Sequence, residues 1–368
     1  MGAKPGIQSK KLPATETASP ELSATVAFWG IAGLLFFTPF FRGLFFPPEM
    51  LLACIIVGGT FLFCVYDQVL RREIWQPRVP LDWAVLALVP AYALSLLTAV
   101  HMRAALGELM EAAACALLYI CAVRAVRREK DLDTLLTVCY AAGCGVAAIG
   151  ILAATGLFPF PGAYGNGVIM STLQYKNALA VYLVLLNVVG LGLSVKEERL
   201  YPKLLYALGN FLFLVVILGT QSRGGWLIYP AAVGSFIALL PAAYRWRASF
   251  HLVIALGCAL AASRSFYEAL RAGGGASAGL FVLYGAAAAV ALQAAYHFLA
   301  RWLNREEVAD STRRLVAICS LGYFALVGAF YISASAGAVA VSGAQVLPVQ
   351  AARRAETISG ADPGFKQR

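Results

Sequence analysis

The segment around Arg223 has the residue types and spacing of a binding site for an anion. The residues from Ser222 to Leu227 read SRGGWL, and they lie between two apolar runs that are too close together for a long loop. An arginine guanidinium donates two parallel hydrogen bonds to a phosphate, and Gly224 and Gly225 let the backbone turn tightly and approach a ligand. The helix that follows adds the positive end of its dipole at the same place. The alternative interpretation is a plain glycine-rich turn followed by an interfacial tryptophan.

A second polar segment precedes an earlier helix. Residues 155–176 read TGLFPFPGAYGNGVIMSTLQYK, and the prolines and glycines indicate an irregular loop. Gln174, Lys176 and Asn177 place donors at the entrance of the next helix, on the same predicted face as Arg223. Taken alone, Lys176 and Asn177 also fit an ordinary helix cap. The shared location favours a joint binding role.

Two more basic residues, Arg103 and Arg264, are predicted on that face. Basic residues usually collect on cytoplasmic loops, so those outside need an explanation. One explanation is a snorkelling anchor at a helix end, and the other is an anionic ligand at the outer leaflet. We include both arginines among the candidate binding residues.

The elements that must position these residues are membrane helices. The chain has 368 residues, of which 60% are hydrophobic and 13% charged, and its mean hydropathy is +0.74. A soluble domain contains about 25% charged residues, so a soluble multidomain enzyme is excluded. We predict an all-α, polytopic membrane helical bundle with about eleven transmembrane helices. The apolar runs are 24–41, 49–66, 81–100, 106–123, 133–154, 177–195, 204–220, 226–243, 248–263, 277–300 and 315–339.

The basic residues predict the orientation of the bundle. With the N-terminus inside, every cytoplasmic segment carries at least two Lys or Arg residues, whereas each loop between helices on the outer side carries one or two. The C-terminus is then outside. The net charge of +10 is explained by basic residues that collect on the predicted cytoplasmic segments. We therefore predict no nucleic-acid partner. The 8 Cys lie almost entirely in apolar runs and predict neither a disulfide framework nor a metal site.

Three regions follow from this organisation. Residues 1–23 are polar and rich in Pro, Ser and Thr, which predicts a disordered cytoplasmic tail. Residues 24–339 form the transmembrane helical domain. Residues 340–368 are interpreted as the start of an extracytoplasmic loop.

The stretch Ser222-Arg223-Gly224-Gly225-Trp226-Leu227 resembles the short S-R-G-G-W/x-L signature of the O-antigen ligase and polymerase family, which are multi-helix membrane glycan ligases. The stretch from Gln174 to Ala180, QYKNALA, is similar to that family's Asn-containing segment before a helix that starts with small residues. Here Tyr175 stands where the family has its first Asn, so this second similarity is partial.

The resemblance implies a GT-C-like helical fold in the bacterial plasma membrane. The donor would be undecaprenyl-diphosphate-linked oligosaccharide, and the acceptor would be a glycan or lipid hydroxyl at the outer leaflet. Arg223 would be the catalytic residue that binds the donor diphosphate. The other candidate binding residues are Ser222, Gly224, Gly225, Gln174, Lys176, Asn177, Arg103 and Arg264. The resemblance implies no cofactor and no metal ion.

The general base is not assigned. In the family a His of a large extracytoplasmic loop serves this role, and the chain reaches residue 368 in what reads as the beginning of that loop, so we expect a truncated chain or an incomplete family member. His101 is interpreted as a structural interfacial residue, with a substitute base as the alternative. Two other functions stay open: a transporter or flippase for an anionic lipid-linked substrate, and a non-catalytic assembly subunit. The scarcity of ionisable residues in the apolar runs argues against ion-coupled transport.

Overall fold

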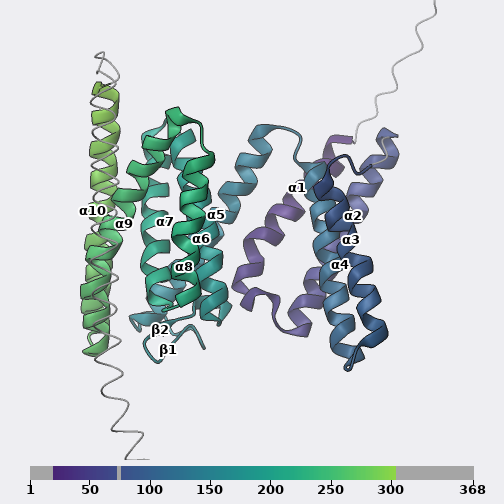
Figure 1. Ribbon diagram of the computed structural model, residues 1–368, viewed down its shortest axis with the longest axis horizontal. Helices are drawn as coiled ribbons and strands as arrows, with labels where there is room; N and C mark the ends of the chain where they lie inside the picture. The colour runs from purple at the N-terminus through teal and green to yellow at the C-terminus, as the bar shows by residue number, and fades with distance from the viewer. Residues whose placement is uncertain (1–19, 73–75, 304–368) are drawn as a thin grey trace, which may run out of the picture.

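The computed structural model describes residues 20–72 and 76–303, which are helical apart from one short hairpin and the connecting turns (Figure 1). The α-helices are α1 (Pro20–Phe37), α2 (Pro47–Arg71), α3 (Pro80–Ser95), α4 (Met102–Ala125), α5 (Glu129–Ala154), α6 (Lys176–Lys196), α7 (Leu200–Gly219), α8 (Arg223–Leu239), α9 (Ala242–Arg271) and α10 (Gly275–Leu303). The 3₁₀ helices are η1 (Thr38–Phe40), η2 (Arg42–Leu44), η3 (Leu96–Thr98) and η4 (Ser171–Leu173). Strands β1 (Tyr164–Gly165) and β2 (Val168–Ile169) pair antiparallel, with Tyr164 opposite Ile169.

The chain is an all-α, multi-pass membrane protein. Among the described residues, 8 helices are long and apolar enough to cross a membrane: α2, α3 with η3, α4, α5, α6, α7, α9 and α10. The fourth predicted run, 106–123, is the weakest by composition and is confirmed as helix α4. Helix α8 has 17 residues, and α1 carries a shorter apolar stretch. The run 315–339 and the segment 340–368 lie outside the described residues, so the count of eleven and the orientation stay predictions.

The predicted helix over the apolar run 248–263 is too short at both ends. Helix α9 begins at Ala242, and it continues past Arg264 to Arg271. The hydropathy pattern does not predict the C-terminal extension because residues 264–271 include both charged and apolar side chains. Phe266 is fully buried, and Arg264 Nε lies 3.2 Å from Glu268 Oε1 one helical turn later. Packing and an i,i+4 pair therefore continue the helix beyond the apolar run.

Helix α5 joins two groups of helices. Helices α1 to α4 lie on one side of it and α6 to α10 on the other (Figure 1). The larger core is built by α5, α6, α7, α9 and α10, and the fully buried Phe211 and Phe213 of α7 lie at its centre. A smaller core joins α1, α2, α4 and α5, where Leu135 of α5 contributes.

A polar network inside the larger group ties four helices together. The Tyr140 hydroxyl of α5 lies 2.7 Å from the Tyr206 carbonyl oxygen and 3.1 Å from Asn210 Oδ1, both on α7. Asn187 Nδ2 of α6 lies 3.4 Å from the Asn210 carbonyl oxygen, and the Tyr229 hydroxyl of α8 donates to Asn187 Oδ1 at 3.1 Å. Polar groups in a membrane interior need such partners. The network therefore holds α6 and α8 in one arrangement.

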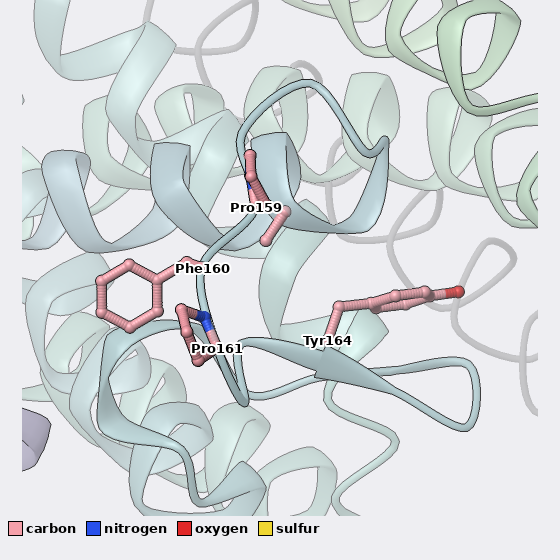
Figure 2. A pocket seen from close by; sticks show the side chains of 5 residues that line it. Pro159, Phe160, Pro161 and Tyr164 are labelled. Atoms are coloured by element: carbon pink, nitrogen blue, oxygen red, sulfur yellow. The ribbon is translucent and has the colours of Figure 1, made fainter.

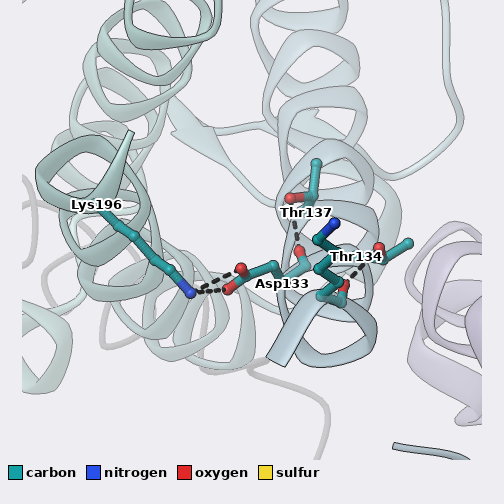
Figure 3. Close-up of polar contacts among 5 residues, drawn as sticks. Asp133, Thr134, Thr137 and Lys196 are labelled. Carbon is teal, nitrogen blue, oxygen red and sulfur yellow. Dashed lines mark hydrogen bonds and ion pairs between the residues drawn. The ribbon is translucent and has the colours of Figure 1, made fainter. Parts of the chain in front are cut away.

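The ends of the helices divide the bundle into two faces. We call the face that carries β1 and β2, where α5, α7 and α9 end and α6, α8 and α10 begin, the hairpin face (Figure 1). On the opposite face, Lys196 Nζ at the end of α6 lies 2.7 Å from Asp133 Oδ2 of α5 (Figure 3). Asp131 and Asp133 have the Asp-x-Asp spacing of some metal sites. Here Asp131 caps the start of α5, accepting from the Arg128 amide at 2.9 Å, and Asp133 is paired with Lys196.

Candidate anion site on the hairpin face

The two polar segments singled out in the sequence meet on the hairpin face. The Ser222 hydroxyl donates to Asn177 Oδ1 at 2.9 Å, although 45 positions separate the two residues. Ser222 is 2% exposed, and its Oγ also accepts from the Gly225 amide at 3.2 Å, which makes Ser222 the N-cap of α8. Asn177 Nδ2 in turn donates to the Tyr175 hydroxyl at 3.1 Å. One serine therefore caps α8 and links it to the start of α6.

Both helices that start here begin with a cation. Lys176 is the first residue of α6 and Arg223 is the first residue of α8, and neither helix has an acidic residue in its first turn. The positive end of a helix dipole disfavours cations by roughly 0.3–1 kcal/mol. Among the described residues, neither the Lys176 nor the Arg223 side chain forms an ion pair or hydrogen bond. Two cations and two dipole ends of the same sign would thus be stabilised by one shared anion.

Gly225 sets how closely the two helices approach. A Cβ built at this position would lie 2.6 Å from Ala180 Cβ on α6, which is too close for a real side chain. Gly224, one residue earlier, has no atom within 4 Å of the corresponding point and is exposed. Gly225 therefore serves the α6–α8 contact, whereas Gly224 leaves open space next to Arg223.

Two glutamines fasten the α5–α6 loop around the site. Gln174 Nε2 donates to the Pro161 carbonyl oxygen at 2.7 Å, and Gln221 Nε2 donates to the Gly167 carbonyl oxygen at 3.0 Å. Gln174 was predicted as a ligand-binding residue, but its amide nitrogen is used within the loop. Its geometry fits a residue that positions the loop.

The connection between α1 and α2 also reaches this face, which sequence reasoning did not include in the site. Thr172 Oγ1 donates to the Pro39 carbonyl oxygen at 2.7 Å, which anchors the connection to the loop at η4. The Arg42 guanidinium carbon lies 4.9 Å from the Phe46 ring centroid. Arg42 is therefore a further cation of the hairpin face. The predicted outer location of Arg42 could have included it among the candidates. No local sequence pattern, however, predicts that the α1–α2 connection contacts η4, which lies about 130 residues later in the chain.

Backbone strain concentrates on the hairpin face. In the described part of the chain, every residue other than glycine that has a positive φ lies there, apart from Arg72 at the end of α2: Arg42, Leu44, Asn166, Ser171, Gln174 and Gln221. Such conformations cost free energy and often accompany functional sites. They occur here in the α1–α2 connection, the α5–α6 loop and the turn before α8.

The structure does not join Arg103 and Arg264 to this arrangement. Arg103 lies in the first turn of α4, in the other group of helices, and is exposed. Arg264 is part of α9 rather than of a loop, and its partner is Glu268. His251 and His297 are buried in α9 and α10, toward the opposite face. No group of three or more His, Cys, Asp or Glu side chains that could hold a metal occurs within residues 20–72 and 76–303.

Comparison with protein-family models, curated proteins and solved structures finds no match to this chain. The resemblance to O-antigen ligases and polymerases therefore rests on the residues of the two short segments.

Proposed function

We propose that this protein transfers or polymerises undecaprenyl-diphosphate-linked oligosaccharide at the outer leaflet of a bacterial plasma membrane, as O-antigen ligases and polymerases do. The observation that carries the proposal is the contact between Ser222 and Asn177. This contact joins the starts of α6 and α8, whose first residues are Lys176 and Arg223. A diphosphate has the charge and the acceptor oxygens that such a site would bind.

The chemistry needs stabilisation of a leaving group. The acceptor hydroxyl attacks the anomeric carbon, the bond from that carbon to the diphosphate oxygen breaks, and negative charge grows on the diphosphate. The Arg223 guanidinium, the Lys176 ammonium and the free amides of the two helix starts would stabilise this charge without rearrangement. The proton of the acceptor goes to a base in hydrogen-bond reach.

A transfer assay tests the proposal directly. The purified protein in proteoliposomes receives undecaprenyl-diphosphate-linked oligosaccharide and an acceptor, and the length and carrier of the glycan are measured. We expect new glycan linkages and release of undecaprenyl diphosphate. A donor that crosses the bilayer chemically unchanged would reject glycan transfer and favour a flippase.

Arg223→Lys tests the proposed catalytic residue. Lysine keeps the charge but loses the planar fork, and a hydrogen bond to a charged group contributes about 1.5–3 kcal/mol. We expect transfer to fall roughly 10- to 100-fold while membrane insertion stays normal. Arg301→Gln, at the end of α10 on the opposite face, is the control and should keep full activity. Wild-type transfer by Arg223→Lys would remove Arg223 from the site.

A further inference from the structure

A small pocket lies in the α5–α6 connection on the hairpin face. Its volume is about 230 Å³, and it is lined by Ala153, Pro159, Phe160, Pro161 and Tyr164 (Figure 2). Pockets that hold drug-sized molecules measure roughly 300–1,000 Å³. This pocket therefore has room for a single small ring, and neither an oligosaccharide nor a polyprenyl chain fits inside it.

The pocket is held in shape by its surroundings. Pro161 accepts the hydrogen bond of Gln174 at 2.7 Å, and the next residue, Gly162, turns the chain with a φ of +75°. Ala163 is fully buried, and its carbonyl oxygen accepts from the amides of Met170 and Ser171 at 2.7 and 2.8 Å. Because the backbone at Pro161 and Ala163 is held by these hydrogen bonds before any ligand arrives, binding needs little ordering of this part of the loop.

A hydrogen bond links the loop that carries the pocket to the turn that carries the candidate anion site. Tyr164 lies on β1, and the turn that follows β1 carries Gly167, whose carbonyl oxygen accepts from Gln221. Gln221 directly precedes Ser222 and Arg223 in the chain. A ligand that places its diphosphate at Arg223 would therefore have the next part of the molecule close to this loop.

The walls of the pocket have a flat apolar side and a polar edge. The Tyr164 ring points to one side of the loop and the Phe160 ring to the opposite side, with Pro159 and Pro161 between them (Figure 2). The Tyr164 hydroxyl makes no hydrogen bond with any residue in the described ranges, so it is free to meet a ligand. A pyranose ring has the matching form, since its C–H face stacks on an aromatic ring and its hydroxyls need donors and acceptors at the rim.

We propose that this pocket binds one sugar ring of the lipid-linked glycan, stacked on Tyr164, while the diphosphate lies at Arg223. The inference rests on the proposed function, whose substrate it describes in more detail. A hydrocarbon chain is the poorer occupant because four of the five lining residues belong to the connection after α5 and not to lipid-facing helices.

Sugar binding can be measured without any transfer reaction. The probes are the methyl glycosides of glucose, galactose, mannose, rhamnose and N-acetylglucosamine, added to the protein in lipid nanodiscs free of sugar detergent. Saturation-transfer NMR should detect at least one of them, with a Kd on the order of 1 mM for so small a ring. Tyr164→Leu keeps apolar bulk against the core but removes the ring face, and should raise this Kd roughly three- to tenfold.

Two variants serve as controls for the binding measurement. Tyr164→Phe keeps the ring and should retain most of the binding. Tyr201→Ala removes an exposed tyrosine at the start of α7, on the opposite face, and should change nothing. Thermal unfolding of each variant shows whether the fold is kept.

The outcomes separate this inference from the proposed function. Arg223→Lys should lose transfer but keep sugar binding, and Tyr164→Leu should raise the KM for the lipid-linked glycan more than it lowers kcat. No sugar binding, or an unchanged KM in Tyr164→Leu, would overturn the pocket inference and leave Arg223-dependent transfer standing. Displacement of the sugar by farnesol would overturn it as well. Tyr164-dependent sugar binding without any change in the glycan would support the pocket and reject glycan transfer.

Discussion

Asn177→Asp should separate the stability of the hairpin face from its function. Aspartate has the size of asparagine and keeps an oxygen that accepts from Ser222, so the link between α6 and α8, measured at 2.9 Å, is preserved. The substitution also places a carboxylate in the first turn of α6, next to Lys176 and across from Arg223. The same charge that suits the helices is the wrong charge for a site that must bind a diphosphate.

The substitution should stabilise the start of α6 and weaken binding of the donor diphosphate. An acidic residue in the first turn of a helix stabilises it by about 0.3–1 kcal/mol, and the hydrogen bond from Ser222 becomes charge-assisted and stronger. Like charges about 6–8 Å apart repel by roughly 2–3 kcal/mol at an effective dielectric constant near 20, and salt reduces this to about 1–2 kcal/mol at a partly exposed site. A loss of that size weakens binding of the donor roughly 5- to 30-fold.

Two measurements on the same preparation check this prediction. Thermal unfolding in nanodiscs at one scan rate should give a Tm for Asn177→Asp at or above that of the wild type. The KM for undecaprenyl-diphosphate-linked oligosaccharide should rise by the factor given above, and more steeply at low salt. Asn166→Asp is the matched control, since Asn166 is exposed at the β1–β2 turn of the same face and has a φ of +52° that aspartate tolerates.

The reasoning would be refuted by Asn177→Asp protein that is stable and transfers glycan as fast as the wild type. That result would mean that no anion approaches the joined starts of α6 and α8. An equal loss of transfer in Asn166→Asp would instead show a general effect of negative charge on this face.

Three further substitutions test how the bundle supports the site. Gly225→Ala should force α8 away from α6 and lower stability by about 1–3 kcal/mol, whereas Gly224→Ala meets open space and should leave the Tm unchanged or slightly raised; equal effects in the two variants would contradict the close approach. Tyr140→Phe removes the buried hydroxyl of the polar network and should lower stability by about 0.6–1.7 kcal/mol, a cost that chemical denaturation in detergent can measure. Lys196→Ala breaks the exposed ion pair with Asp133, which contributes no more than about 1 kcal/mol, so a large drop in Tm would show that this pair is more important than its exposure suggests.

The amino-acid sequence by itself determined the class of the protein and the position of most helices. A helix that crosses a membrane must satisfy its backbone internally and present about 20 mostly apolar residues to lipid, so a single segment carries its own signal. This is why even the run 106–123, which contains Glu108 and Glu111, predicts α4 correctly. The run 226–243 likewise predicts α8, although the helix begins at Arg223 and ends at Leu239.

The sequence-based boundaries failed where local hydropathy was not the deciding force. Helix α9 runs past its apolar segment because Phe266 finds a buried position against other helices. That position exists only once α7, α9 and α10 have packed together, so no window along the chain contains the information.

Tertiary structure alone decided which residues form the candidate site. The pairing of Ser222 with Asn177 depends on how closely α8 can approach α6, and that distance is set by the missing side chain of Gly225 and by the buried network below it. The same packing brought Arg42 to the hairpin face and left Arg264 on α9 with Glu268. Hydropathy reports the environment of one segment, whereas contacts between segments depend on side-chain shapes that only the packed bundle brings together.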